Sequence, residues 1–244
     1  MLSLRENLKL TRNILDSNAI VFIIPAVIAA LLMDVARLVI EPISPASKLT
    51  TELVNVDLST FQSMLGPLVV YMLVQNIFQA IMNAIGWGAI TVATFGSLEG
   101  RVVSFGGCMK VAFSSIIPLA IAGIIASELS TMGYVLLVAP GILFTTLFSM
   151  TTPVLLFEGK GVLDSLKQSY LLVRRSIWAT FTIYCVAWII TFVAQVIISS
   201  MINSFGDLGF YGRVLFSVAK AFIDPVLPIA LTVHFFSLKS LEKK

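Results

Sequence analysis

Long apolar runs divide this chain and limit the folds that it can adopt. A helix that crosses a bilayer needs roughly 20 consecutive apolar residues, and six runs approach or exceed that length. The predicted spans cover residues 19–40, 67–95, 110–127, 133–157, 176–202 and 212–236. Because these runs are continuous and lack the alternation of barrel strands, we expect six transmembrane helices in an all-α membrane fold.

The composition supports a membrane rather than an aqueous environment. Of the 244 residues, 58% are hydrophobic and 12% are charged, whereas a soluble domain is about 25% charged. Such a chain has too little polar surface to cover a soluble fold. We therefore predict a single polytopic membrane domain over residues 1–244, with no separate soluble domain among them.

Lysine and arginine gather in every second connection between the predicted spans. The basic connections carry Arg5, Lys9, Arg12, Arg101, Lys110, Lys160, Lys167, Arg174, Arg175, Lys239, Lys243 and Lys244. The opposite connections hold Lys48 and Arg213. Because basic loops stay on the cytoplasmic side, we predict a multi-pass protein of the cytoplasmic membrane with both termini in the cytoplasm.

Few residues in the sequence could carry metal or acid–base chemistry. Cys108 and Cys185 lie in apolar stretches without metal-binding spacing, and His234 is the single histidine. The motifs H-E-x-x-H and G-x-S-x-G are absent, as are basic runs interleaved with aromatic residues. We expect no catalytic residues, no cofactor, no metal and no nucleic-acid partner. Both cysteines are interpreted as small buried hydrophobes, and His234 and Trp87 as anchors near span ends.

The longest stretch rich in charge is "FEGKGVLDSLKQSYLLVRRSIW", residues 157–178. Apolar residues repeat along it at helical spacing, at Val162, Leu166, Tyr170, Val173 and Ile177. Lys167, Arg174 and Arg175 lie off this stripe, so the segment is predicted to be a helix at the cytoplasmic interface. Two interpretations remain: these three residues recognise lipid headgroups or a partner, or they only anchor the chain.

A related segment occurs at the N-terminus. When residues 3–23 are placed on 165–185, Ser3 falls on Ser165 and Arg12 on Arg174, and each segment runs into a predicted span. A fainter copy begins at Glu99. The sequence therefore predicts three units, each made of an interfacial helix followed by a two-span hairpin.

Residues 138–181 resemble the signature of a family of six-span bacterial and archaeal membrane proteins. The pattern is a span with Pro140-Gly141 and a late Pro153, then Glu158-Gly159 and a Ser-Leu-basic helix with a basic pair. The family includes the YciC-like proteins and the membrane domain attached to some glycerophosphodiester phosphodiesterases. The resemblance implies the fold; it carries over no catalytic residue, because the phosphodiesterase chemistry belongs to a separate soluble barrel.

Polar side chains interrupt the second predicted span. Asn76, Gln79 and Asn83 fall on one helical face, beside a row of small residues formed by Ala80, Ala84 and Gly88. Amides in hydrocarbon are costly, so they mark either a lined pathway or a packing seam with hydrogen bonds between helices.

Charged pairs occur in two predicted spans. Lys220 and Asp224 lie one turn apart in span six, just before Pro225, which is expected to kink the helix. Asp34 and Arg37, near the outer end of span one, are expected to form an interfacial pair. A charge pair beside a kink suits a proton- or ion-coupled transporter, and a static bundle tolerates it as well.

Two functions are compatible with these features. The first is a non-enzymatic module that organises or binds membrane lipids, or serves as a subunit beside another membrane protein or in a homo-oligomer. The alternative is a small transporter or channel that uses Lys220, Asp224 and the polar face of span two. An intramembrane enzyme acting on lipid is a third class, but no recognised catalytic motif supports it.

Overall fold

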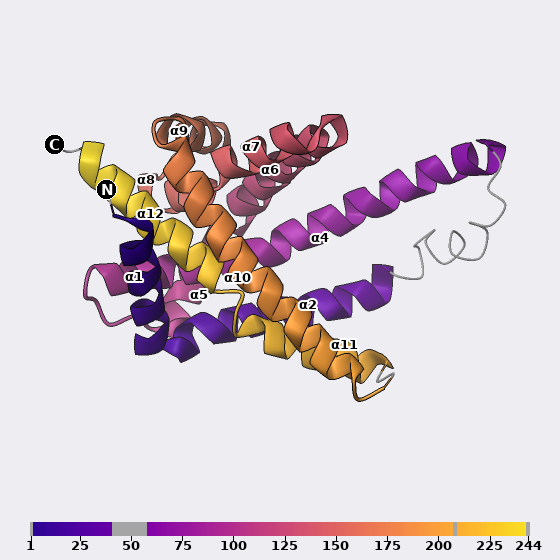
Figure 1. The fold of residues 1–244 in the computed structure, drawn as a ribbon, viewed down its shortest axis with the longest axis horizontal. Helices are drawn as coiled ribbons and strands as arrows, with labels where there is room; N and C mark the ends of the chain where they lie inside the picture. The colour runs from indigo at the N-terminus through magenta and orange to yellow at the C-terminus, as the bar shows by residue number, and fades with distance from the viewer. Residues whose placement is uncertain (1, 41–57, 207–208, 243–244) are drawn as a thin grey trace.

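The computed structural model describes residues 2–40, 58–206 and 209–242, and all its regular elements there are α-helices (Figure 1). The polar loop predicted around Lys48 lies outside these ranges. The helices are α1 (Leu4–Ser17), α2 (Ala19–Ile40), α4 (Leu58–Leu98), α5 (Phe105–Ser114), α6 (Ile116–Leu136), α7 (Val138–Phe148), α8 (Thr151–Glu158), α9 (Val162–Arg174), α10 (Ile177–Asn203), α11 (Gly209–Ala221) and α12 (Val226–Glu242).

Six stretches of the described chain are long and apolar enough to cross a membrane, which confirms the predicted all-α, six-span class. They are Ala19–Leu38, Leu73–Leu98, Ile116–Tyr134, Val138–Glu158, Ile177–Asn203 and Gly209–Leu241. The first and fifth agree with the predicted limits to within two residues. The others differ for identifiable physical reasons.

The third and fourth spans begin later than predicted. Lys110 lies in the separate short helix α5, and the chain bends at Ser115 before α6 begins. The predicted turn at 127–133 is helical, because the hydroxyls of Ser127 and Ser130 donate to carbonyls of their own helix, those of Ile124 and Ala126. The turn comes at Leu137 instead, whose backbone is extended.

Helix α4 is much longer than the second predicted span. Its 41 residues measure about 61 Å at about 1.5 Å per residue, roughly twice the apolar thickness of a bilayer. Its first turns project beyond the other helices (Figure 1). The row of small residues predicted as a seam does pack: Ala84 is buried in one cluster with Leu119 of α6, and a Cβ on Gly88 would lie 3.0 Å from Leu119.

The fourth span is divided into α7 and α8, and α9 stabilises the division. Pro153 lacks an N–H, so the helix cannot continue its hydrogen-bond ladder through this point. The hydroxyl of Ser169 in α9 donates to the carbonyl of Leu147 at 2.8 Å and accepts from the N–H of Met150 at 3.2 Å. A polar residue of α9 is therefore buried at the break, facing the bundle.

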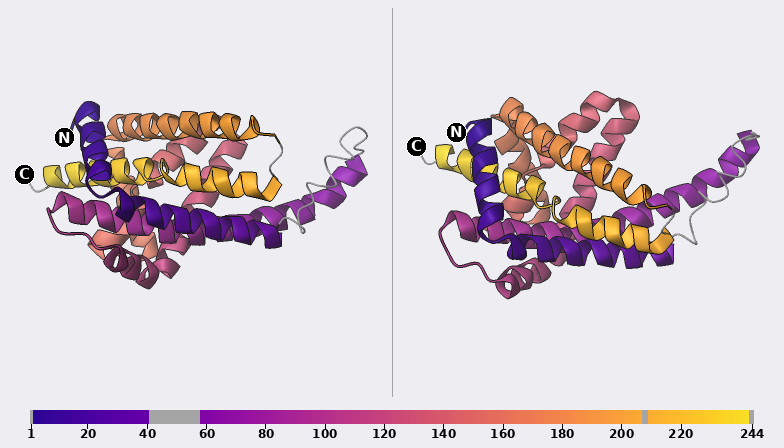
Figure 2. Two further views of the ribbon diagram at one scale, coloured as in Figure 1. Left: turned by 90° about the horizontal axis from the view of Figure 1, so that it is seen from below. Right: turned by 60° about the horizontal axis from the view of Figure 1, so that its bottom comes forward.

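The short helices α1, α5 and α9 occupy equivalent places in three successive units. Each leads within three residues into a spanning helix, as the predicted helix-plus-hairpin order requires. Helix α5 packs on α4, and α9 packs on α7 and α8, so each contacts the span that precedes it. Helix α1 packs on α12, the last helix of the third unit, so the first unit contacts the third (Figure 2).

The two ends of the bundle differ in packing. At the terminal end, where both chain termini lie (Figure 1), the rings of Phe95 and Phe157 are 4.4 Å apart and those of Phe95 and Phe236 are 4.9 Å apart. His234 is fully buried there and shares a 3.0 Å hydrogen bond with Thr180, so its predicted anchoring role is wrong. The opposite, distal end, formed by the ends of α2 and α10 and the start of α11, is hollow.

Candidate polar cavity within the spans

The sixth span is interrupted beside the predicted ion pair. Helix α11 ends at Ala221 and α12 begins at Val226, so the expected kink is an interruption of about one turn, in which the N–H of Asp224 still donates to the carbonyl of Lys220 at 3.0 Å. Pro225 and Pro228 lack the N–H groups that would otherwise continue the ladder. Lys220 Nζ lies 3.1 Å from Asp224 Oδ2 across this break, which confirms the predicted pairing.

A third polar residue joins the pair from a neighbouring helix. The side-chain amide of Gln195, in α10, donates to Asp224 Oδ1 at 3.3 Å, so both carboxylate oxygens have a partner. Lys220 is 35% exposed and Asp224 is 22% exposed. These charges are therefore not sealed into the protein, and they face a cavity.

That cavity, of about 250 Å³, brings together residues from four helices, α4, α10, α11 and α12. It has room for about eight water molecules at about 30 Å³ each. Its polar lining comes from α4, α10 and the break in the sixth span: Gln79, Asn83, Thr191, Gln195, Lys220 and Asp224. Gln79 donates to Asn83 at 3.0 Å. Trp87 also lines it, rather than anchoring the chain at a membrane surface.

A second cavity, of about 370 Å³, lies between α4 and the helices α6 to α8, with contributions from α10 and α12. Asn76, Gln79 and Asn83 all line it, so the predicted polar face is present. Asn76 donates to Glu128 of α6 at 2.9 Å. Sequence reasoning missed Glu128 because it assigned this residue to a loop.

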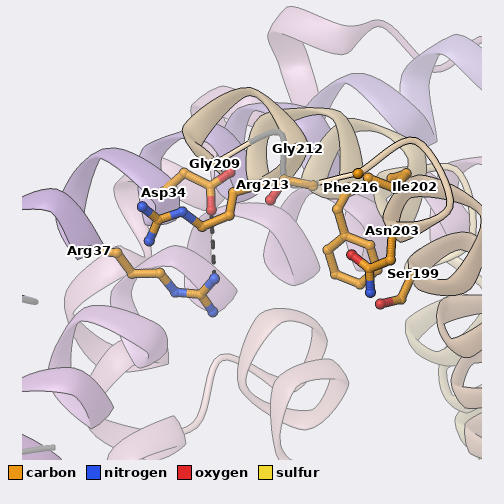
Figure 3. A pocket seen from close by; sticks show the side chains of 11 residues that line it. Asp34, Arg37, Ser199, Ile202, Asn203, Gly209, Gly212, Arg213 and Phe216 are labelled. Carbon is orange, nitrogen blue, oxygen red and sulfur yellow. Dashed lines mark ion pairs between the residues drawn. The ribbon is translucent and has the colours of Figure 1, made fainter. Parts of the chain in front are cut away.

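Two further cavities continue toward the distal end. One, of about 130 Å³, is lined by Asp34 and Arg37 as well as by Lys220 and Asp224. The other, of about 480 Å³, is named here the vestibule and is lined by Asp34, Arg37 and Arg213 (Figure 3). Arg37 Nη1 lies 3.6 Å from Asp34 Oδ1, as predicted, but Asp34 is buried rather than interfacial, at 6% exposure.

The basic residues predicted to contact lipid headgroups lie elsewhere. Lys167, Arg174 and Arg175 are exposed on α9, and none of them lines these four cavities. The guanidinium of Arg174 lies 5.9 Å from the ring centre of Tyr170.

Four of the five residues of the predicted apolar stripe of α9 are buried or pack partly buried against the core, and one is exposed. Tyr170 is exposed, and the buried positions are Ser165, Leu166, Ser169, Leu172 and Val173. Of the predicted stripe, Leu166 and Val173 are buried.

Other candidate chemistry is sparse in the part of the chain that the structure describes. There, no three or more His, Cys, Asp or Glu side chains are grouped so that they could hold a metal ion. Cys108 is buried, as expected, whereas Cys185 is partly exposed on α10. The four cavities present amide, hydroxyl and charged side chains, which are groups that can bind a polar solute.

In comparisons with known proteins, the chain matches no protein-family model, no curated protein and no solved structure. The resemblance to YciC-like membrane proteins therefore stays an interpretation of residues 138–181.

Proposed function

We propose that this chain is a small transporter that admits a polar solute to the cavity beside Lys220 and Asp224. One observation carries the proposal: an ion pair at a helix break shares a cavity with amides from two other helices. Broken spans of this kind form solute sites in secondary transporters, because the interrupted backbone lines a cavity there. The proposed activity is non-enzymatic.

The alternative of a simple packing seam accounts less well for this region. Polar groups that serve only helix association approach one another and exclude space between the helices. Here Gln79 and Asn83 are bonded to each other, yet they still border the cavities on either side of α4. The small residues of α4 and the bond from Asn76 to Glu128 of α6 provide the seam, and Gln79 and Asn83 are left to line the space.

The cavities are arranged with one wide end and one closed end. The vestibule widens at the distal end, and the clustered rings of Phe95, Phe157 and Phe236 fill the terminal end. With the basic connections on the cytoplasmic side, as the sequence predicts, the vestibule faces outward. We infer that transport requires a second conformation in which the terminal end opens.

Reconstitution into liposomes tests the proposal. Concentration jumps with a panel of amino acids, sugars, polyamines and organic anions are applied, and solute-induced currents and uptake of labelled solute are measured. We expect one solute class to be transported, with loss of transport in K220Q and D224N. The exposed pair Arg12–Asp16, 3.5 Å apart, supplies the matched controls R12Q and D16N. Absence of transport across the panel, or full transport by D224N, would contradict the proposal.

A lipid-binding module is the second candidate, and the outer face of α9 favours it. Lys167 and Arg174 are exposed there beside Tyr170, and Trp178 follows at 79% exposure. Basic and aromatic side chains together suit the interface of an anionic membrane. Native mass spectrometry of gently extracted protein tests this function: retained anionic lipid that is lost in K167Q/R174Q supports it, and a stoichiometric second polypeptide indicates a subunit.

A further inference from the structure

We infer that the cavity of about 370 Å³ between α4 and the helices α6 to α8 is a binding site for a small neutral polyol, either a free sugar or the hydroxylated headgroup of a lipid. Neither Lys220 nor Asp224 lines this cavity, and the inference does not depend on the transport proposal. It derives from the kinds of side chain in the lining and from the hydrogen bonds that they already make.

Among the described residues that line this cavity, none is charged. The hydrogen-bonding side chains are mainly amides of α4 and hydroxyls of α6, α7, α8 and α10. Each of the other three cavities is lined by both acidic and basic side chains. An ion that entered the neutral cavity would lose water without meeting an opposite charge, which is costly. The lining therefore suits an uncharged ligand.

The hydroxyls of the lining can accept hydrogen bonds from a ligand. Ser127 and Ser149 each donate to the carbonyl three residues earlier, at 2.9 Å and 2.8 Å. A serine that donates in this way keeps lone pairs on its oxygen as acceptors. Ser127 is exposed and Ser149 is partly exposed, so a ligand can reach both side chains.

The amides of α4 supply donors as well as acceptors. Asn76 donates to the Glu128 carboxylate at 2.9 Å, which leaves its Oδ1 atom as an acceptor. Gln79 donates to Asn83 Oδ1 at 3.0 Å, which leaves the N–H groups of the exposed Asn83 side chain as donors. An ammonium group only donates and a carboxylate only accepts, whereas a hydroxyl does both. A molecule with several hydroxyls matches this mixture of groups.

The size and the aromatic lining of the cavity agree with a sugar. A volume of about 370 Å³ has room for about 12 water molecules at about 30 Å³ each, and a hexose has a similar number of non-hydrogen atoms. Trp87 and Tyr184 line the same space. Small-molecule sites commonly combine aromatic side chains with a few placed polar groups, and the C–H faces of a sugar ring can pack on such rings.

Binding to the purified full chain tests the inference. The chain is placed in phosphatidylcholine nanodiscs, because glucoside and maltoside detergents carry the chemistry under test. Saturation-transfer NMR compares glucose with two analogues of the same ring, glucose 6-phosphate and, at mildly acidic pH, protonated glucosamine. We expect glucose to bind about tenfold more tightly, or more, than either charged analogue.

An added lipid distinguishes the two sources of this chemistry. Nanodiscs that contain a glucosyl diacylglycerol are compared with plain phosphatidylcholine discs. If the site belongs to a lipid headgroup, this lipid should displace glucose and should be retained in native mass spectrometry. If the site belongs to a free solute, the added lipid should leave glucose binding unchanged.

Two substitutions locate the site. We expect N83A to weaken glucose binding about tenfold and S127A about threefold, the losses expected for two hydrogen bonds and for one. Ser127 lines this cavity and none of the other three. Ser114, exposed on α5, makes the same bond to the carbonyl three residues earlier at 2.9 Å, so S114A is the matched control. Asn13, exposed on α1, supplies the control N13A.

Several outcomes would overturn the inference: equal affinity for glucose and its charged analogues, unchanged binding by both N83A and S127A, or no binding of glucose or of the glucosyl lipid. Where a variant does not fold, the analogue series on the wild-type chain decides. Failure of this site is distinguishable from failure of the transport proposal. Glucose binding without transport into liposomes would leave the site, and transport by a chain that binds no polyol would refute the site alone.

Discussion

The terminal and distal ends of the bundle differ in the side chains that occupy a broken spanning helix. Each contains a span broken at proline, which leaves backbone groups without helical partners. The break between α7 and α8 is bridged on its α9 side by the hydroxyl of Ser169, and Ser149 and Thr151 of the same break line the cavity of about 370 Å³. Toward the distal end, the break between α11 and α12 carries an ion pair beside open space. The first break is bridged by a neutral hydroxyl, and the second carries a charged pair.

The largest effect is expected from removing an aromatic ring at the terminal end. Phe235 is 1% exposed and contacts the rings of Phe157 and Phe236. F235A should lower the free energy of unfolding by about 3 kcal/mol, because the surroundings cannot fill the cavity that is left. Phe205, 75% exposed near the distal end, provides the control F205A. Unfolding in detergent by denaturant compares the two, and equal losses would contradict the packing difference.

The second-largest effect is expected from removing the side chain that bonds the break between α7 and α8. S169A removes both hydrogen bonds at the break between α7 and α8, and it leaves a buried carbonyl and N–H unpaired. We expect a loss of about 2 kcal/mol in unfolding free energy. Ser165, also fully buried in α9, makes one longer bond of 3.3 Å, so S165A should cost less. A larger loss for S165A would show that Ser169 does not stabilise the break.

Thiol labelling should distinguish the ends by access to water. Ser199 lines the vestibule and is partly exposed, so S199C should react with a charged maleimide, in a chain whose Cys185 is replaced by serine. Cys108, at the terminal end, is 3% exposed, and burial raises the pKa of its thiol. Less thiolate is present at pH 8, and its labelling should be about tenfold slower or more. Mass spectrometry measures both rates, and similar rates would argue against a hydrated vestibule.

The smallest effect concerns the start of α1. Ser3 and Glu6 form a capping box, and hydrogen bonds from the Ser3 backbone and hydroxyl lower the pKa of the Glu6 carboxyl. A lowered folded-state pKa means that the stabilisation is present above the ordinary value of 4.5 and is lost as the pH falls through the folded-state value.

S3A should therefore destabilise the protein by about 1 kcal/mol or less at neutral pH. The difference between S3A and the wild type should shrink at low pH, where Glu6 is protonated in both. Thermal melts between pH 7 and pH 3 check this, and a constant difference would contradict it.

Local patterns predicted the parts of the molecule that depend on one helix. The six spans, the Lys220–Asp224 pair and the shared face of Asn76, Gln79 and Asn83 follow from spacing along a single element. Gln195 could not be assigned to Asp224, because that contact depends on how α10 and α11 are placed relative to each other. Glu128 was assigned to a loop because the polar stretch of residues 127–133 resembles a turn in sequence. In the structure Ser127 and Ser130 bond to carbonyls of their own helix, and Glu128 accepts from Asn76 of α4.

The same limit applies to the short helices. Periodicity predicted which segments of 3–23 and 165–185 are helical, but not which polar residues they bury. Ser169 and Asn7 are fully buried because each reaches a backbone carbonyl of another helix, that of Leu147 for Ser169 and that of Ala230 for Asn7. Such partners are distant in sequence and carry no local signal.

The docking of α1 on α12 has a consequence for biosynthesis. Asn7 leaves the ribosome early, but its acceptor, the carbonyl of Ala230, is 223 residues further along the chain. The N–H of Leu2 similarly donates to the hydroxyl of Ser237, which is synthesised much later. Until the final hairpin is inserted, the polar stripe of α1 stays uncovered at the membrane surface. Docking of α1 on α12 therefore completes only after the last span has been synthesised.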